Sequence, residues 1–300
     1  MLNREIIRLI RPHQWLKNIF VFTPLFFSRH ATDWHYALPC LLAFLAFCAA
    51  ASGVYCFNDM HDAEADRRHP VKRLRPIASG AVSKTAARIT TAAAWLLACA
   101  LVATGRFLEW QQQKGLAITL LAYIVMNIAY CVKLKQIALL DVFIVATGFV
   151  LRIIAGGLAT GIVLSHWIVL TTFLLALFLS MAKRRDDVTV FEASGVKARK
   201  NVERYNSAFL CSAIAVLGGI TVVCYILYTV SFDVQERIGS HHGHYLYATS
   251  VFVLAGILRY MQLTMVESKS GSPTEVLLHD HFIHACIAGW IAMFTFILYV

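Results

Sequence analysis

Apolar segments long enough to cross a lipid bilayer recur along the whole chain and limit what it can fold into. The 300 residues are 59% hydrophobic and only 15% charged, which is too little polar surface to cover a soluble globule. A helix needs roughly 20 apolar residues to cross a hydrocarbon core of about 30 Å. A membrane barrel would instead need alternating segments of about ten residues, and the sequence lacks them. The sequence therefore predicts an all-α polytopic membrane protein.

We expect about nine transmembrane helices in a single domain that covers residues 1–300. Their predicted ranges are 16–30, 36–58, 86–105, 115–132, 138–160, 163–182, 206–230, 245–266 and 281–300. The first is short, which favours a tilted or partly interfacial segment. The longer polar connections are an Asp-rich loop at 58–85, a second polar loop at 183–204, and a third polar region at 267–280.

The 27 Lys and Arg residues are distributed unevenly between the two sides of the predicted membrane. One side carries most of them, whereas the loops of the other side hold only Arg29, Arg106, Lys114 and Arg237. Because cytoplasmic loops are enriched in Lys and Arg, this asymmetry predicts a cytoplasmic N-terminus and cytoplasmic polar loops. The basic residues form no soluble basic domain, so we expect no nucleic-acid partner.

The cysteines and histidines do not form a recognisable metal site. The eight cysteines are scattered through apolar segments without a CxxC pair, which is typical of small buried side chains. The clustered histidines lack an acid or a cysteine that would complete a ligand set. We therefore expect surface histidines at His241, His242, His244, His279, His281 and His284.

The most informative segment runs from Asn58 to Pro76 and contains four acidic and five basic residues. If the preceding helix continues through it, Asn58, Asp62 and Asp66 share one face, with Asp59 beside them. Stacked carboxylates repel each other unless a cation lies between them, and oxygen ligands suit Mg²⁺, with Mn²⁺ as an alternative. These four residues are the predicted metal ligands. The alternative is a solvated loop in which acidic and basic side chains simply pair.

The basic half of this segment suits a polyanion. Pro70 and Pro76 break helical structure and so give Lys72, Arg73 and Arg75 defined positions. Control of membrane topology alone would also explain the charge. Together, the two halves predict a site for metal-bound pyrophosphate at a membrane face.

Further candidates lie at the cytoplasmic ends of other predicted helices. Asp186, beside Lys183 and Arg184, is a weaker candidate for a second metal contact; a simple stop signal is the alternative. Asp141 lies about one turn inside the membrane, where a carboxylate needs a partner, and we expect Lys133, Lys135 or a substrate cation to supply it. Polar residues expected to face a cavity, or else to anchor or pair structurally, are Lys17, Asn18, Tyr130 and Arg152.

The segment NDMHDAEADRRHPVKRLRPIASG resembles the first Asp-rich motif, NDxxDxxxD, of the UbiA superfamily of intramembrane prenyltransferases. More narrowly, it is similar to the decaprenyl-phosphate phosphoribosyltransferase branch. RPHQWLKN, YCVKLKQIALLDVFIVATGFVLRIIAGG, FLSMAKRRDD and SPTEVLLHD resemble other segments of that branch. The resemblance implies nine helices around a central cavity that is capped by cytoplasmic loops, in a bacterial inner membrane. The second Asp-rich motif departs from the family pattern because it lacks a well-spaced DxxxD.

The resemblance also implies an activity. It is Mg²⁺-dependent transfer of 5-phosphoribose from phosphoribosyl pyrophosphate to a polyprenyl phosphate, releasing pyrophosphate, in the synthesis of cell-envelope glycan precursors. The basic side chains would neutralise charge on the leaving group. The expected catalytic residues are Asn58, Asp62, Asp66, Lys72 and Arg75. The expected substrate-binding residues are Lys17, Asn18, Arg73, Tyr130, Lys133, Lys135, Asp141, Arg152, Lys183 and Arg184.

Two other functions are weighed against this one. The first is a prenyltransferase that moves a polyprenyl group from its diphosphate to an aromatic acceptor in quinone synthesis. The second is a transporter or flippase, which the gathering of charges on one membrane face disfavours. A homo-oligomer and the chain length of the acceptor stay open.

Overall fold

The computed structural model describes residues 2–28, 30, 32–68, 71–106, 112–195, 201–238, 243–267, 276 and 279–299. Expectations for His69 and Pro70, for most of the 267–280 region, for 196–200 in the second polar loop, and for His241 and His242 lie outside these residues. Helices, turns and short connections make up the described chain, which contains no β-strand.

Eight helices within the described residues are long and apolar enough to cross a membrane. They are α3 (Trp34–Arg67), α4 (Lys84–Ala103), α5 (Gln113–Val132), α6 (Leu140–Thr160), α7 (His166–Ser194), α8 (Ser207–Val230), α10 (Ser250–Met265, preceded by the 3₁₀ helix η6, Gly243–Thr249) and α12 (His281–Tyr299). Shorter elements are α1 (Leu2–Ile10), α9 (Phe232–Ile238), η2 (Lys72–Leu74), η3 (Thr104–Arg106), η4 (Leu134–Gln136) and η5 (Val202–Arg204). The prediction of a polytopic helical membrane protein is confirmed.

The first predicted span, 16–30, differs from the others. It consists of a 3₁₀ helix, η1 (Pro12–Phe22), followed by the short helix α2 (Thr23–Phe27). Pro12 and Pro24 stand at the starts of these two elements, where proline is tolerated because the N–H group it lacks would have no helical partner. A 3₁₀ helix rises about 2.0 Å per residue, so η1 and α2 together reach roughly 30 Å. This segment can therefore supply a ninth crossing without a long α-helix.

Two polar segments are more helical than a loop. Helix α3 continues to Arg67, so residues 58–67 of the predicted loop at 58–85 extend the helix. This continuation is the condition under which the acidic residues were predicted to share one face. Helix α7 likewise continues to Ser194, which makes 183–194 helical. Where 183–204 was predicted to be a loop throughout, that prediction is wrong for its first half.

The chain was expected to form one domain, and its internal contacts group into two units. Unit 1 contains residues 1–134 and 151–164, and unit 2 contains residues 135–150 and 165–300. Helix α6 contributes its first half to unit 2 and its second half to unit 1.

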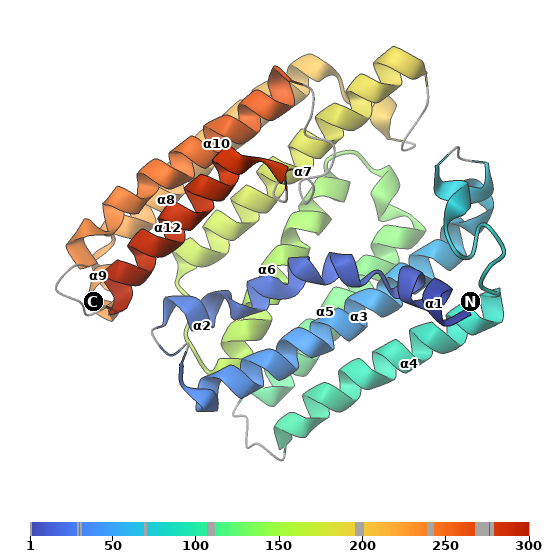
Figure 1. Cartoon of the computed structure of the whole chain (residues 1–300), viewed down its shortest axis with the longest axis horizontal. Coiled ribbons are helices and arrows are strands. Elements are labelled where there is room, and N and C mark those ends of the chain that lie inside the picture. The colour runs from blue at the N-terminus through green and yellow to red at the C-terminus, as the bar shows by residue number, and fades with distance from the viewer. Residues whose placement is uncertain are drawn as a thin grey trace. The chain divides into compact units, whose positions relative to one another are not determined.

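Unit 1 is built around α3. This helix packs most extensively against α4, and also against η1 and α5; α3 and α4 lie side by side in Figure 1. Small side chains at 46 and 49–51 in α3 allow this close packing around the buried Phe47. Gly53 faces the ring of Trp95 from α4, whose Nε1 donates to the carbonyl of Ala50 at 3.3 Å.

Unit 2 is a bundle of α7, α8, α10 and α12. The main packing pairs are α7 with α8 and α10 with α12, and α8, α10 and α12 run alongside one another in Figure 1. Its core contains the fully buried Phe178, Leu210 and Ile214. Tyr260 of α10 packs against Phe178 with ring centroids 5.6 Å apart.

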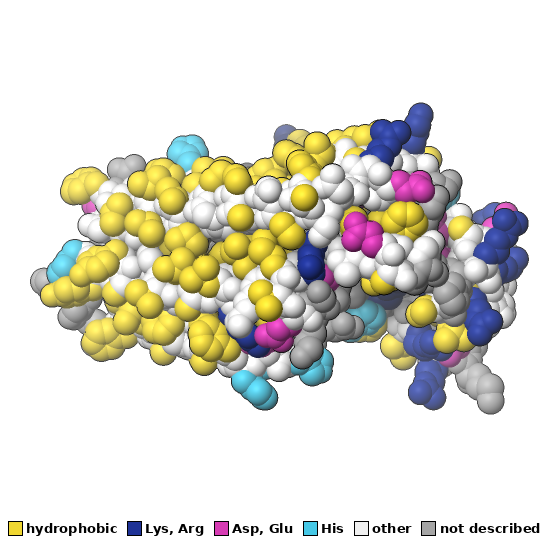
Figure 2. Space-filling view, turned by 90° about the horizontal axis from the view of Figure 1, so that it is seen from above, with side chains coloured by type: hydrophobic (Ala, Val, Ile, Leu, Met, Phe, Trp, Pro, Cys, Tyr) yellow, Lys and Arg dark blue, Asp and Glu magenta, His cyan; other side chains and the backbone are white. Residues whose placement is uncertain are grey.

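Large apolar side chains cover much of the outer helical surface, as Figure 2 shows for one face. Leu96 in α4, Ile118 in α5 and Val216 in α8 are each more than half exposed. Such surfaces are unfavourable in water but match lipid tails. The chain is therefore a multi-pass membrane protein.

We expect Gly156→Ala to destabilise unit 1. A Cβ at Gly156 would clash with the carbonyl oxygen of Val21, so α6 and η1 would have to separate. Overpacking of this kind costs about 1–3 kcal/mol. The matched control is Gly219→Ala, whose Cβ would meet nothing within 4 Å. Thermal unfolding of detergent-solubilised protein should show a lower Tm for Gly156→Ala alone, and equal Tm values for both variants would contradict the packing.

Candidate functional site

Two buried carboxylates mark the last turns of α3. The side chains of Asp59 and Asp66 are 2% and 6% exposed. They are separated by about two helical turns and therefore share a face, on which Asn58 and Asp62 are half-buried. We refer to Asn58, Asp59, Asp62 and Asp66 as the acidic stripe. The structure places these residues together at the end of α3, and Asp59 and Asp66 are the most buried of them.

Two arginines pair with these carboxylates. One nitrogen of Arg75 lies 3.2 Å from Oδ1 of Asp59 and 2.7 Å from Oδ2 of Asp66. Arg11 donates to the same Oδ1 of Asp59 at 2.6 Å. We refer to Arg11, Asp59, Asp66 and Arg75 as the arginine–aspartate network. Its two guanidinium charges balance its two carboxylates.

The segment after η2 packs back onto the end of α3 and so delivers Arg75. Arg75 itself has an extended backbone, and the residues after it are buried. Ile77 and Val82 pack with Ala63 of α3 in a small apolar cluster. Because these apolar contacts fix the chain on both sides of the turn, the guanidinium is held over the two carboxylates.

Arg11 was not predicted to be a site residue. Its segment is fixed against α3 through Ser52, which accepts a hydrogen bond from Trp15 Nε1 and donates one to the carbonyl of Ile10, both at 3.0 Å. The resemblance of RPHQWLKN to a family segment was the signal that could have found Arg11.

The other predicted phosphate ligands of this segment lie on η2. Lys72 is half-buried and Arg73 is exposed. Of Lys72, Arg73 and Arg75, it is Arg75 that belongs to the arginine–aspartate network, so the three basic residues do not occupy equivalent positions.

The acidic stripe fits a divalent cation by its chemistry. Among the described residues, no three His, Cys, Asp or Glu side chains converge as a ready metal site, and arginines pair with two of the carboxylates. However, Oδ2 of Asp59 is buried and has no hydrogen-bond partner within the described chain. A buried carboxylate oxygen needs such a partner, and a cation would supply one. The predicted ligands Asn58, Asp59, Asp62 and Asp66 all offer the oxygen atoms that Mg²⁺ prefers.

Arg152 and Asn18, both predicted to bind substrate, pair with each other inside unit 1. Arg152 is 5% exposed; its Nε donates to Oδ1 of Asn18 at 2.7 Å and its Nη2 to the hydroxyl of Tyr123 at 3.0 Å. The guanidinium also lies 4.9 Å from the centroid of the Tyr123 ring. These contacts agree with the alternative of a structural pair between helices.

Asp141 lies in unit 2 and is fully buried, as expected, and it pairs with an arginine and a tyrosine that were not predicted as its partners. It accepts hydrogen bonds from Nε of Arg184 at 2.7 Å and from the hydroxyl of Tyr205 at 3.0 Å. The Tyr205 hydroxyl in turn accepts from the backbone N–H of Leu139 at 2.7 Å. Burial raises the pKa of Tyr205 to about 12, and the charge of Asp141 contributes, so the hydroxyl keeps the proton that it donates.

Arg184 and its neighbours anchor the second polar segment. Arg184 also binds Asp187 at 2.9 Å, and Arg185 donates to the backbone carbonyl of Thr264 on α10. Asp186 and Lys183 are half-buried on the same stretch of α7. The two arginines therefore have structural partners within unit 2, and the metal role of Asp186 remains a prediction.

The remaining predicted substrate residues differ in exposure. Lys133 is exposed, whereas Lys17, Tyr130 and Lys135 are half-buried. Their substrate roles stay predictions.

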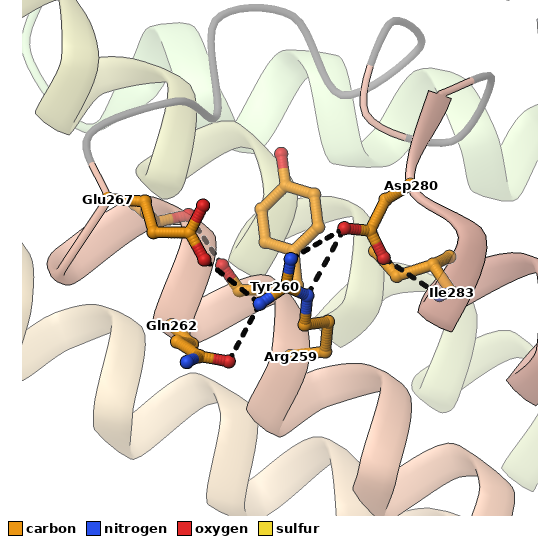
Figure 3. Close-up of polar contacts among 7 residues, drawn as sticks. Arg259, Tyr260, Gln262, Glu267, Asp280 and Ile283 are labelled. Carbon is orange, nitrogen blue, oxygen red and sulfur yellow. Dashed lines mark hydrogen bonds and ion pairs between the residues drawn. The ribbon is translucent and has the colours of Figure 1, made fainter.

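A third polar group in unit 2 surrounds Arg259 of α10 (Figure 3). The guanidinium binds Oδ2 of Asp280 at 2.8 and 3.1 Å and Oε1 of Glu267 at 2.9 Å. Asp280 also accepts the N–H of Ile283 at 2.9 Å, so it caps the start of α12. Arg259 thus ties α10 to the start of α12. The hydrogen bond from Arg259 lowers the pKa of Asp280.

Comparison with known proteins identifies the family to which the chain belongs. The model of the UbiA prenyltransferase family matches residues 19–287. A decaprenyl-phosphate phosphoribosyltransferase of Mycolicibacterium smegmatis is 35% identical over 95% of this chain and 90% of its own length.

Solved structures support the same fold. A UbiA homolog from Archaeoglobus fulgidus bound to GPP and Mg²⁺ aligns with a TM-score of 0.69 at 19% identity, covering 99% of this chain and 100% of that one. The structure of the homolog bound to Cd²⁺ aligns with a TM-score of 0.66 at 20% identity, covering 98% and 99% of the two chains.

We expect Tyr205→Phe to destabilise unit 2. The change leaves the N–H of Leu139 without its acceptor and removes one donor from the buried Asp141, which costs about 1–3 kcal/mol. Tyr247→Phe is the control because this tyrosine of the same unit is 55% exposed. Urea unfolding monitored by tryptophan fluorescence should shift for Tyr205→Phe and not for the control; equal midpoints would show that the network carries little stability.

The ion pair of Arg259 with Asp280 should stabilise the fold in a pH-dependent way. Because the folded pKa of Asp280 lies below its unfolded value, near 3.9, the stabilisation is present above that pH and is lost as pH falls through the folded pKa. The Tm gap between wild type and Arg259→Gln should therefore be largest near neutral pH and shrink towards pH 3. The exposed Arg88→Gln should show no such dependence. A gap independent of pH would rule out the pairing.

Proposed function

Because the chain belongs to the UbiA prenyltransferase family, a family of transferases, we propose that it transfers 5-phosphoribose from phosphoribosyl pyrophosphate to a polyprenyl phosphate. The observation that carries the proposal is the 35% identity, over 95% of this chain, to a protein that bears the name of this activity. We infer that the product is a precursor of cell-envelope glycans.

The acidic stripe and the basic residues after it are the proposed donor site. Asn58, Asp59, Asp62 and Asp66 would hold Mg²⁺, with Mn²⁺ as an alternative and Asp186 as a weaker contributor. When bound, the metal would neutralise the pyrophosphate and so make it a better leaving group. Metal-bound structures of the archaeal homolog support a divalent cation in this fold.

The basic side chains stabilise the departing charge. Lys72, Arg73 and Arg75 bind pyrophosphate oxygens as the bond from ribose C1 to oxygen breaks. The attacking phosphate oxygen of the lipid is already anionic at neutral pH, so the site needs no strong general base. A reaction that needs no strong general base is compatible with a site built from carboxylates and guanidiniums. Lys17, Tyr130, Lys133, Lys135 and Lys183 remain candidates for the lipid phosphate and the ribose 5-phosphate.

The apolar tail of the acceptor stays in the bilayer. We propose that the enzyme lies in the bacterial plasma membrane with its N-terminus and the acidic stripe on the cytoplasmic side, because most Lys and Arg residues flank that side. The donor then comes from the cytosol and the acceptor from the lipid phase.

A transfer assay tests the proposal. Purified protein in lipid nanodiscs, given Mg²⁺, decaprenyl phosphate and phosphoribosyl pyrophosphate labelled in the ribose, should yield a labelled, solvent-extractable lipid and an equal amount of pyrophosphate. Replacing Asp62 and Asp66 together by Asn should reduce the rate by about 100-fold or more, because the charge that holds the metal is lost. Glu64→Gln, an exposed residue of the same helix, should keep the rate.

Two outcomes would contradict the proposal. If pyrophosphate release from the donor continued at the normal rate in the double variant, the metal role of the stripe would be wrong. If the protein instead prenylated an aromatic acid from a polyprenyl diphosphate and ignored phosphoribosyl pyrophosphate, the alternative activity in quinone synthesis would replace it.

A further inference from the structure

The arginine–aspartate network pairs its own charges within the described chain. Oδ1 of Asp59 accepts from Arg11 at 2.6 Å and from Arg75 at 3.2 Å, and Arg75 also reaches Asp66 at 2.7 Å. Two positive and two negative side chains therefore neutralise each other around carboxylates that are almost fully buried.

This balance penalises a divalent cation that binds alone. A metal ion at Asp59 and Asp66 would compete with the guanidiniums for the carboxylates and would add two positive charges beside them. Displaced charges that stay poorly solvated and unpaired are costly. An anion with several oxygens that enters together with the metal removes this cost, because each displaced guanidinium gains a new acceptor.

We propose that Arg11, acting with Arg75, makes metal binding depend on the pyrophosphate group of the donor. In the substrate-free protein the two guanidiniums occupy the acidic stripe; with metal and pyrophosphate present they transfer to phosphate oxygens and leave the carboxylates to the cation. The proposal rests on the metal-held pyrophosphate of the proposed function and assigns Arg11 to the donor site. Metal and pyrophosphate then bind with positive coupling, each raising the affinity of the other.

The backbone at Arg11 supports a specific role. Arg11 has φ 53° and ψ 63°, in the left-handed region, and it precedes a proline. Side chains other than glycine rarely adopt this region, which is costly and persists where the surrounding structure enforces it, often at functional sites. The guanidinium also lies 5.2 Å from the centroid of the Tyr55 ring, which gives it a second favourable contact while it changes partners.

The exposure of the two arginines supports exchange. Their side chains are 20% and 26% exposed, whereas those of Asp59 and Asp66 are 2% and 6% exposed. Both arginine side chains therefore reach the surface in part, whereas the two carboxylates are enclosed. The buried Oδ2 of Asp59, which lacks a hydrogen-bond partner in the described chain, is an oxygen that the cation can use.

Arg11→Gln is the decisive variant because the proposal predicts opposite changes in two affinities. Mn²⁺ binding alone, measured by electron paramagnetic resonance of the purified protein, should tighten by about tenfold. Binding of labelled inorganic pyrophosphate at saturating Mn²⁺ should weaken by about tenfold. Arg11→Lys should restore both in part, and Arg8→Gln, which removes an exposed arginine paired with Glu5, should change neither.

A purely structural role for Arg11 predicts a different pattern. Damage to the fold would weaken both affinities, and that result would overturn the proposal, as would an unchanged affinity for Mn²⁺ alone. Asp59→Asn, nearly isosteric, should weaken Mn²⁺ binding in both conditions, which checks that the measured ion is at the network. The assay uses neither phosphoribosyl pyrophosphate nor a lipid acceptor, so failure of the transfer reaction and failure of this coupling are distinguishable.

Discussion

A charge buried in an apolar helical bundle must have a partner, and this constraint organises the polar interior of the protein. Water is scarce among these helices, so an unpaired ion would cost several kcal/mol. Three buried charged residues have partners of different kinds. Asp59 is paired with Arg11 and Arg75, Arg152 with Asn18 and Tyr123, and Asp141 with Arg184 and Tyr205.

Most of the fold follows from the lengths of the apolar runs, because the thickness of the hydrocarbon core sets the length of a spanning helix. Eight of the nine predicted spans coincide with long helices to within a few residues at most of their ends. The larger errors occur where hydropathy carries no information. Beyond the membrane an amphipathic or polar helix and a loop have similar composition, so the extensions of α3 to Arg67 and of α7 to Ser194 could not be deduced from polarity. The 3₁₀ geometry of η1, which packs against α3, is not contained in its local hydropathy pattern.

The acidic residues of the site could be predicted from the sequence, whereas the residues that pair with them could not. Helical spacing alone placed Asn58, Asp59, Asp62 and Asp66 on one face. The partners come from distant positions: Arg11 is 48 residues from Asp59, and Arg184 is 43 residues from Asp141. Nearby lysines looked equally suitable for Asp141 on charge alone. The choice depends on how α6 and α7 pack within unit 2 and on the strained turn at Leu139, whose φ of 67° no sequence rule foresees.

The two acidic centres differ in a way that bears on their chemistry. In unit 2, Arg184 is 4% exposed and Asp141 is fully buried, and a tyrosine and a second carboxylate complete the pairing. Breaking that pair would leave both ions without water, so it is fixed and serves the fold. In unit 1 the arginines are several-fold more exposed, and one carboxylate oxygen of Asp59 still lacks a hydrogen-bond partner in the described chain. Only the second arrangement lets a guanidinium leave its carboxylate at moderate cost. The proposed release of pyrophosphate after each turnover needs such exchangeable pairs, because ligands that bound the metal and the anion independently and tightly would retain both.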